Sequence, residues 1–439
     1  MTRDRADTLI VNGLVITCDS EDTVLENGWV SITGGKIGGI GTDETAETPE
    51  AVEIIDANGC IVMPGLVNSH THLPMSLFRG LADDLPLMEW LNDHMFPAER
   101  TYINPESVFS AALLSCAEML LSGTTTCCDG YFYEDRVAEA VHTTGMRAVL
   151  GQGIIDFPAP GVSDPEKNIL HASAFVEKWM GRSDTITPSL FCHSAYTCSE
   201  RTLKEAKASA GRHKLLFQIH AAETKDECGQ SVADVGLTPI RYLDKIGILD
   251  EKTLIVHGVW MDEEEMTILS ASGAKVAHCP ESNMKLGSGI APVWEQLGAG
   301  ITVGIGTDGC ASNNDLDMFL EMDTASKLQK VTKLDPSVMD AGTVVKMATI
   351  EGAKAVGLDH MTGSLQPGKE ADIIIIDTKQ LHLVPMYNPF SHIVYSAKGA
   401  DVRDVFVSGK RLVKDRSLLT MDAEQIVSKF YNNGPVAIK

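Results

Sequence analysis

The middle of the chain constrains the fold most, because short apolar runs alternate there with stretches of helical character. Eight such runs lie between residues 64 and 368, namely residues 65–68, 124–128, 147–153, 186–192, 214–219, 253–256, 274–277 and 301–305. Apolar runs separated by helical stretches are typical of parallel strands joined by helical crossovers. Eight parallel strands within about 300 residues predict a closed TIM-type β/α barrel rather than an open sheet.

One crossover illustrates the helical character. Asn104 can cap a helix, Pro105 suits the first helical position, and Gly123 can end the helix. The apolar residues between them recur at helical spacing: Val108, Ala112, Cys116 and Met119. We therefore expect a helix here, leading directly into the strand that begins at residue 124.

Both terminal regions have a different sequence pattern, in which short β-prone runs alternate with turns. The runs cover residues 8–17, 29–33, 36–40 and 52–55 near the start, and 371–377, 402–407 and 410–413 near the end. This pattern predicts small antiparallel sheets, and the two regions can share one β-sandwich. A chain of 439 residues also exceeds what one hydrophobic core usually supports. We expect a barrel domain at residues 64–368 and a small β-sandwich built from residues 1–63 and 369–439.

The charge of the chain restricts its partners. The formal net charge is -24, so a nucleic-acid backbone or an anionic membrane is repelled over most of the surface. A small neutral substrate fits this charge better. The first residues are charged, and no apolar run reaches the roughly 20 residues of a membrane helix. We expect a cytoplasmic protein without nucleic-acid or membrane partners, and the sequence leaves open whether it forms a homo-oligomer.

The ten cysteines are scattered without a CxxC pair or a regular spacing. Several of them lie in apolar segments, where a thiol acts as a small hydrophobic side chain. We therefore expect reduced thiols and no structural zinc cluster.

Two histidines just past the first barrel strand are the first candidate metal ligands. His70 and His72 flank Thr71, and residues i and i+2 of an extended segment point to the same side. The two imidazoles can therefore share one metal ion. Two surface histidines at a strand end would give the same pattern, so the pair by itself is a weak signal.

Three further strand ends carry groups that complement this pair. His220, His257 and Asp308 each follow a predicted strand, and barrel active sites collect residues from the carboxyl ends of several strands. Three neutral imidazoles and one carboxylate suit zinc or ferrous iron and leave a position for water. The combination predicts a metal-dependent active site.

Glu223 lies three residues beyond His220. A carboxyl group there can stand beside a metal ion without binding it, which is the place of a proton shuttle. An acid stabilised by the amino end of a helix is the alternative interpretation. Within the group of strand-end residues we favour the catalytic role.

Three motifs together resemble the amidohydrolase superfamily: residues 64–72 (PGLVNSHTH), 220–223 (HAAE) and 307–309 (TDG). Four more resemble the 5-methylthioadenosine/S-adenosylhomocysteine deaminases: residues 87–91 (LMEWL), 96–99 (FPAE), 278–287 (HCPESNMKLG) and 308–314 (DGCASNN). The resemblance covers nearly the whole chain. It implies a hydrolytic deaminase that converts 5'-methylthioadenosine, S-adenosylhomocysteine or adenosine to the corresponding inosine and ammonia.

The resemblance also implies roles for individual residues. The metal ligands would be His70, His72, His220 and Asp308. Glu223, His257 and Asp308 would carry the catalytic proton transfers, and Trp90, Glu99, His193 and Glu223 would contact the substrate. Trp90 as a core aromatic residue and Glu99 as a solvated acid are the alternative interpretations.

One divalent ion, zinc or alternatively iron, is the expected cofactor. Superfamily members with two ions bridge them with a lysine on the fourth strand, but here that strand ends in Phe191-Cys192-His193-Ser194. No lysine is available at that position. The sequence therefore predicts a single ion, with His193 directed at the substrate.

One position departs from the family pattern. Some members carry an arginine where this chain has Gln152, and its absence removes a partner for the carboxylate of an amino-acid substituent. The 5'-substituent of the nucleoside therefore stays open. A related hydrolase acting on guanine, cytosine or a chlorinated s-triazine is the alternative activity, and a non-catalytic scaffold is a third interpretation that the intact site residues disfavour.

Overall fold

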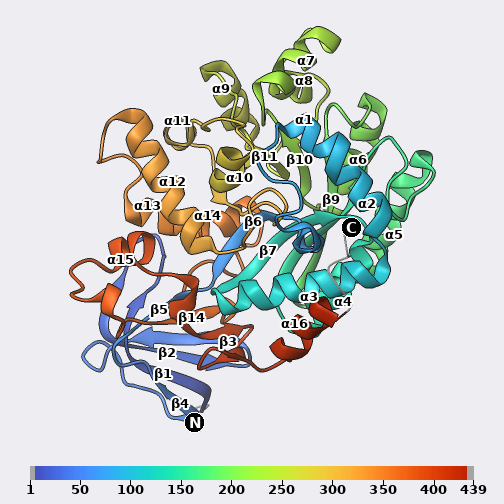
Figure 1. Cartoon of the computed structure of the whole chain (residues 1–439). Coiled ribbons are helices and arrows are strands. Elements are labelled where there is room, and N and C mark those ends of the chain that lie inside the picture. The colour runs from blue at the N-terminus through green and yellow to red at the C-terminus, as the bar shows by residue number, and fades with distance from the viewer. Residues whose placement is uncertain (1–4, 433–439) are drawn as a thin grey trace.

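Eight parallel strands form the centre of the computed structural model, which describes residues 5–432 (Figure 1). The strands are β6 (Leu66–Thr71), β7 (Thr124–Tyr131), β8 (Arg147–Ile154), β9 (Ile186–Ser194), β10 (Phe217–Ala221), β11 (Thr253–His257), β12 (Lys275–His278) and β13 (Val303–Ile305). They pair in chain order, each parallel to its neighbours. All eight predicted runs contribute a strand. β10 begins later than expected, because Lys214 takes a left-handed φ of 56° at the end of the preceding helix.

The first and last strands meet and close the barrel at its carboxyl end. The backbone N–H of Asp308 donates to the carbonyl oxygen of His70 at 3.0 Å. The N–H of Thr307 donates to Oδ1 of Asn68 at 3.1 Å. A Cβ at Gly306 would lie 2.6 Å from the backbone nitrogen of His70, so only glycine allows this approach. The predicted TIM-type barrel is therefore confirmed.

Helices connect the strands and surround the barrel (Figure 1). They are α3 (Pro105–Leu121), α4 (Glu134–Thr144), α5 (Asn168–Trp179), α6 (Glu200–His213), α7 (Lys225–Val235), α8 (Pro239–Lys245), α9 (Glu263–Ser272), α10 (Pro280–Lys285), α11 (Val293–Gly298), α12 (Met318–Lys333), α13 (Ala341–Met347) and α14 (Ile350–Ala355). The predicted crossover is α3, and Oδ1 of Asn104 caps it by accepting hydrogen bonds from the N–H groups of Glu106 and Ser107 at 3.1 Å each. That prediction is confirmed.

A long connection between β6 and α3 covers part of the barrel mouth. It contains η1 (Leu73–Phe78), α1 (Leu87–Glu89), the π-helical turn η2 (Trp90–Met95) and α2 (Phe96–Tyr102). Shorter 3-10 turns lie elsewhere at η3 (Pro165–Lys167), η4 (Leu381–Leu383) and η5 (Gly399–Asp401). The connection matters for function because η2 and α2 carry Trp90 and Glu99, two of the predicted substrate contacts.

Alternation along the strands divides the apolar side chains between two cores. Ile219 and Ile255 join the large core between strands and helices. Leu254 and Val256 join a smaller cluster that includes Ala353 of α14. His220 pairs in register with Val256, so the alternation that places Ile219 against the helices turns His220 to the barrel interior.

The two ends of the chain build one nine-stranded sheet. Its strands are β1 (Ala6–Ile16), β2 (Val24–Thr33), β3 (Lys36–Gly41), β4 (Ala51–Asp56), β5 (Cys60–Pro64), β14 (Ile373–Asp377), β15 (Val402–Val407), β16 (Lys410–Lys414) and β17 (Ser417–Leu418). The prediction of a purely antiparallel sheet is wrong, because β1 pairs in parallel with both β4 and β5. Strands from both termini become neighbours where β14 pairs with β5.

The nine-stranded sheet forms the small β-sandwich domain beside the barrel. Its own apolar core joins residues from both chain ends, among them Ile10, Val62, Ile373 and Phe406. Two helices follow β14, namely α15 (Pro389–Tyr395) and α16 (Ala423–Asn432). The boundaries 1–63, 64–368 and 369–439 stay a prediction. Within residues 5–432 no helix is long and apolar enough to cross a membrane.

Candidate metal centre and substrate pocket

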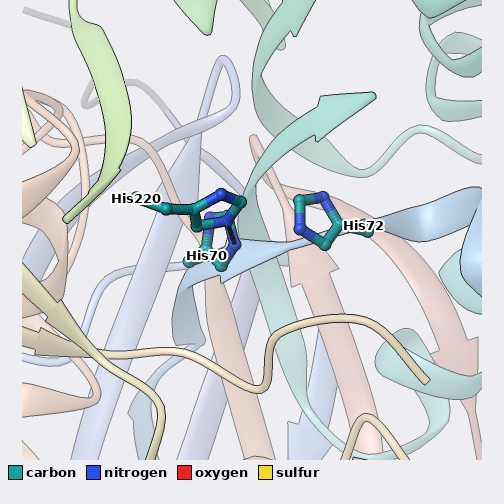
Figure 2. A group of neighbouring side chains, drawn as sticks. All are labelled: His70, His72 and His220. Carbon is teal, nitrogen blue, oxygen red and sulfur yellow. Dashed lines mark hydrogen bonds between the residues drawn. The ribbon is translucent and has the colours of Figure 1, made fainter. Parts of the chain in front are cut away.

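Three buried histidines meet at the carboxyl end of the barrel strands. His70 lies in β6 next to its last residue, His72 follows that strand, and His220 lies in β10. Each offers one ring nitrogen, and the three atoms lie within 4.8 Å of one another. Nε2 of His70 and Nε2 of His220 are 3.2 Å apart, as the dashed line in Figure 2 shows. The fold therefore brings together three of the predicted metal ligands, from strands that are far apart in the sequence.

Asp308 lies beside this cluster, after β13. Its Oδ1 is 3.5 Å from Nε2 of His70 and 3.4 Å from Nε2 of His72. The other oxygen, Oδ2, accepts hydrogen bonds from the hydroxyl groups of Ser282 at 2.7 Å and Ser312 at 2.8 Å. These bonds hold the carboxylate so that Oδ1 faces the histidines. Sequence reasoning assigned no role to either serine, although both lie in the motifs 278–287 and 308–314.

The electrostatics favour neutral histidines beside an ionised aspartate. Burial lowers the pKa of His70 to about 4 and holds the pKa of His220 well below its ordinary value. Burial also acts to raise the pKa of Asp308, but its contacts with His70 and His72 hold that pKa well below the usual range. Nδ1 of His72 donates to the carbonyl oxygen of Gly130 at 2.6 Å, which leaves the lone pair on Nε2. These are the protonation states that bind a divalent ion.

Three residues at the site have left-handed backbones. The φ angles are 55° at Ala222, 74° at His257 and 61° at Asp308. Residues other than glycine rarely adopt this left-handed region. Such strain costs on the order of 1 kcal/mol or more per residue and persists only where surrounding contacts enforce it. The carbonyl oxygen of Ala222 accepts hydrogen bonds from Val259 and Trp260, both at 2.8 Å. The concentration of strain at three strand ends marks this end of the barrel as functional.

Glu223 and His257 face each other next to the histidine cluster. Oε2 of Glu223 is 3.7 Å from Nε2 of His257, and its Oε1 accepts a hydrogen bond from the hydroxyl of Ser288 at 3.2 Å. Nδ1 of His257 donates to Oδ1 of Asn283 at 3.0 Å. Burial raises the pKa of Glu223, against the opposing effect of His257. The raised pKa makes this carboxyl group hold a proton more readily than an exposed glutamate does, a property that suits the predicted proton donor.

A carboxylate behind this pair fixes the turn that presents Glu223. Oε1 of Glu227 accepts a hydrogen bond from the N–H of Ala222 at 3.2 Å, and Oε2 accepts one from the N–H of Glu223 at 2.7 Å. Glu227 therefore supports both the strained residue Ala222 and Glu223, the predicted proton donor. The sequence analysis did not predict this role of Glu227. An acidic residue in the first turn of a helix, four residues after Glu223, was the signal that could have indicated it.

The histidine cluster opens into a pocket lined by three predicted substrate contacts, Trp90, His193 and Glu223. Trp90 lies in η2 and is 5% exposed, so it also contributes to the core around it. The His193 ring lies 5.2 Å from that of His220, nearly perpendicular to it, and its Nδ1 is 3.0 Å from the hydroxyl of Thr197. Tyr196, which was not predicted, lines the same pocket.

Glu99 lies farther from the cluster, in an adjoining pocket. It is buried and its Oε1 accepts a hydrogen bond of 2.5 Å from the hydroxyl of Tyr131. Burial raises the pKa of Glu99 to about 7, with the hydrogen bond from Tyr131 acting in the opposite direction. The interpretation of Glu99 as a solvated acid is therefore wrong. Oε2 stays available to a ligand.

Gln152 does not face the pocket. Its Oε1 accepts a hydrogen bond from the N–H of Glu134 at 3.1 Å, so its side chain lies against the start of α4. The next residue on β8, Gly153, lines the pocket instead. Strand alternation explains the difference, because neighbouring residues point to opposite faces. A role of position 152 at the distal end of the ligand therefore lacks support in the geometry.

The sequence matches the Amidohydrolase family over residues 61–412. A 5-methylthioadenosine/S-adenosylhomocysteine deaminase 1 from Syntrophus aciditrophicus is 44% identical over 427 residues, which cover 97% of this chain and 96% of that protein. A 5'-deoxyadenosine deaminase from Methanothermobacter thermautotrophicus is 44% identical, with 92% and 93% covered.

Two solved structures show the same fold. An adenosine deaminase from Xanthomonas campestris with bound zinc superposes with a TM-score of 0.95 at 36% identity, covering 98% of each chain. An atrazine chlorohydrolase from Arthrobacter aurescens, complexed with zinc, has a TM-score of 0.90 at 24% identity, covering 97% of this chain and 99% of that one. The second likeness shows the fold alone. Taken with the family match and the sequence relatives, these findings establish that the chain belongs to the amidohydrolase family and groups within it with the 5-methylthioadenosine/S-adenosylhomocysteine deaminases.

Proposed function

We propose that this protein is a metal-dependent aminohydrolase that converts a 5'-substituted adenosine, such as 5'-methylthioadenosine, S-adenosylhomocysteine or adenosine itself, to the corresponding inosine and ammonia. The observation that carries the proposal is the position of Glu223 and His257, facing each other beside the cluster of His70, His72 and His220. The sequence relatives, which are named as deaminases of such nucleosides, support this reaction.

The donor atoms at the site fit a divalent metal ion. The Nε2 atoms of His70 and His220 are only 3.2 Å apart. Their lone pairs would repel each other unless a cation or a proton lies between the two nitrogens. His70, His72, His220 and Asp308 would hold one ion, zinc or iron. A bound divalent ion would act as a Lewis acid. It would lower the pKa of water, so that a hydroxide nucleophile becomes accessible near neutral pH.

The chain's own groups would move the protons. Asp308, held ionised, takes one proton from the attacking water, while His257 orients that water. Glu223, with its raised pKa, protonates the ring nitrogen N1 of the purine as oxygen bonds to C6. Asp308 then passes its proton to the amino group, the C6–N bond breaks and ammonia leaves. The remaining hydroxyl proton returns to Glu223, which restores the starting state.

Three residues would position the nucleoside. Trp90 covers a face of the purine, since an indole suits a flat aromatic ligand. His193 hydrogen-bonds the ligand near the cluster, and Oε2 of Glu99 accepts a hydrogen bond from the ribose hydroxyls. These roles, like those of the ligands and Glu223, remain predictions that substitution tests.

A substrate panel tests the reaction. Purified protein is incubated with adenosine, 5'-deoxyadenosine, 5'-methylthioadenosine, S-adenosylhomocysteine, guanine, cytosine and a chlorotriazine, and release of ammonia or chloride is measured. We expect ammonia from the adenosine nucleosides. Chloride release without deamination would select the triazine activity instead, and no turnover with metal restored would favour the non-catalytic scaffold.

Glu223→Gln isolates the proton donor. We expect kcat to fall by roughly 100-fold or more, while fold and metal content stay unchanged, because the amide cannot deliver a proton. Asp226→Asn, three residues away and exposed, is the matched control and should keep full activity. Near-normal turnover of Glu223→Gln would make Glu223 a structural acid.

The remaining expectations stay predictions. They are a single ion per chain, the choice of zinc over iron, a cytoplasmic location and the absence of nucleic-acid partners. Elemental analysis of purified protein decides the first two, because it counts ions per chain and names the element.

A further inference from the structure

Three pockets adjoin one another, beginning at the histidine cluster. The pocket at the cluster shares His72 and His193 with a second pocket, which reaches Glu99. The second pocket shares Phe96 and Glu99 with a third. Because consecutive pockets share side chains, the third pocket adjoins the one that reaches Glu99, on the side away from the cluster pocket.

The third pocket, which we call the distal pocket, is lined among others by Phe96, Phe132, Phe157 and Arg100. Its empty space, open solvent included, is about 1410 Å³, compared with about 430 and 470 Å³ on the same measure for the two inner pockets. The rings of Phe96 and Phe157 meet edge to face with centroids 5.5 Å apart. The pocket therefore combines an apolar wall with one cation and has room for a long substituent.

Arg100 is the single lysine or arginine that lines these three pockets. It follows Glu99 in α2, so the predicted ribose contact and the cation are adjacent in the chain. Within the described part of the chain the guanidinium has no hydrogen bond or ion pair, in contrast to Arg79, Arg136 and Arg241, which each pair with a glutamate or aspartate. Glu99 lines the same pocket but forms no ion pair with Arg100, so in a protein of net charge -24 this guanidinium is available for an anionic ligand.

We infer that Arg100 binds the carboxylate of an amino-acid substituent on the 5' position, so that the distal pocket accepts substrates of the S-adenosylhomocysteine type. This inference rests on the proposed deaminase function. The thioether and methylene groups of the substituent would lie against Phe96 and Phe157, and the carboxylate would reach the guanidinium. Arg100 therefore supplies the cation of the distal pocket from α2.

The experiment compares two substrates that differ in one group. S-adenosylhomocysteine carries the carboxylate, and its decarboxylated analogue keeps the thioether and amino group but lacks that charge. We measure kcat/KM for both substrates with the wild-type protein, Arg100→Gln and Arg100→Lys. Arg212→Gln is the matched control, because Arg212 is also exposed and lies in α6, outside the three pockets.

Arg100→Gln should lower kcat/KM for S-adenosylhomocysteine by roughly 10-fold, the effect of one charge-assisted hydrogen bond at a solvent-accessible site. The decarboxylated analogue and 5'-methylthioadenosine should change by less than about 2-fold. Arg100→Lys should recover part of the loss because it keeps the charge. Arg212→Gln should leave every ratio unchanged.

Two results would overturn the role of Arg100 while leaving the deaminase function intact. One is an equal loss with both substrates in Arg100→Gln, and the other is wild-type protein that deaminates 5'-methylthioadenosine but not S-adenosylhomocysteine. Absence of deamination with every nucleoside, in wild-type protein of full metal content, would instead remove the proposed function itself.

Discussion

The two ends of the barrel treat buried charge in opposite ways. At the amino end of β8, the buried Arg147 donates to Asp372 through Nε at 2.7 Å and through Nη2 at 3.1 Å. It also donates to the hydroxyl of Ser408 at 2.8 Å, and the N–H of Ser408 donates to the same aspartate at 2.8 Å. Every charge there has a partner inside the fold, and the bonds join the barrel to the β-sandwich.

The carboxyl end leaves its buried groups incompletely paired. Nδ1 of His70 has no hydrogen-bond partner among residues 5–432, and its Nε2 lies only 3.2 Å from Nε2 of His220. Burial raises the pKa values of Glu99 and Glu223, so these carboxyl groups are costly to ionise. Ala222, His257 and Asp308 add backbone strain.

The comparison teaches where the molecule is built for stability and where it is built for a ligand. A buried ion pair with full hydrogen bonding is complete without anything else. A cluster of neutral imidazoles and protonatable acids becomes complete only when a cation and a substrate bind. Substitutions at the two ends should therefore fail in different ways.

The largest expected effect is the loss of metal and activity in His72→Ala. We expect less than one ion per chain and a fall in kcat of more than about 1000-fold, because the Lewis acid contributes several kcal/mol to the transition state. Elemental analysis and an ammonia assay measure the two quantities. The control is His94→Ala, an exposed histidine on the same connection between β6 and α3. Full metal content with full activity would show that His72 is not a ligand.

Breaking the paired end should affect stability and not catalysis. Asp372→Asn leaves the Arg147 charge buried without its carboxylate, which should cost about 3–5 kcal/mol in the free energy of unfolding. Urea denaturation measures this cost, and kcat per folded molecule should stay within about 2-fold of wild type. Glu166→Gln, which breaks the exposed pair with Arg201, should cost less than about 1 kcal/mol. Equal costs for the two variants would contradict the distinction between the pairs.

The smallest effect is a pH dependence at Glu99. Its pKa is raised to about 7 by burial, so its favourable contribution to stability is present below its unfolded pKa and is lost as the pH rises through 7. Glu99→Gln cannot ionise and should gain stability relative to wild type between pH 5 and pH 8, by about 2–3 kcal/mol. Unfolding at both pH values measures the difference. The control is the exposed Glu89→Gln, whose free energy of unfolding should differ from that of wild type by the same amount at both pH values. If the difference between Glu99→Gln and wild type were also the same at pH 5 and pH 8, the burial argument would be contradicted.

Much of the fold could be predicted because its signals are local. Each barrel strand is an apolar run bounded by turns, and each candidate metal ligand lies within a few residues of the end of such a run, as His220 follows the run 214–219. Barrel geometry brings strand ends together without further information. The order of strands and strand-end residues therefore led to the barrel and to the candidates His70, His72, His220, His257 and Asp308. The family resemblance then implied His70, His72, His220 and Asp308 as the ligands, and the structure brings these four together.

Other features depend on contacts between residues far apart in the sequence, and only the tertiary structure decided them. The parallel pairing of β1 with β4 and β5 and the hydrogen bond from Tyr131 to Glu99 join distant segments. The direction of the Gln152 side chain depends on the phase of β8 relative to the pocket, and a shift of one residue reverses it. Arg100 gains its proposed role only because α2 folds over the barrel mouth and places it beside Phe157 in one pocket. Sequence determined which chemical groups stand at the strand ends, because that property is local. Tertiary structure decided which side chains surround them, because that property depends on long-range packing.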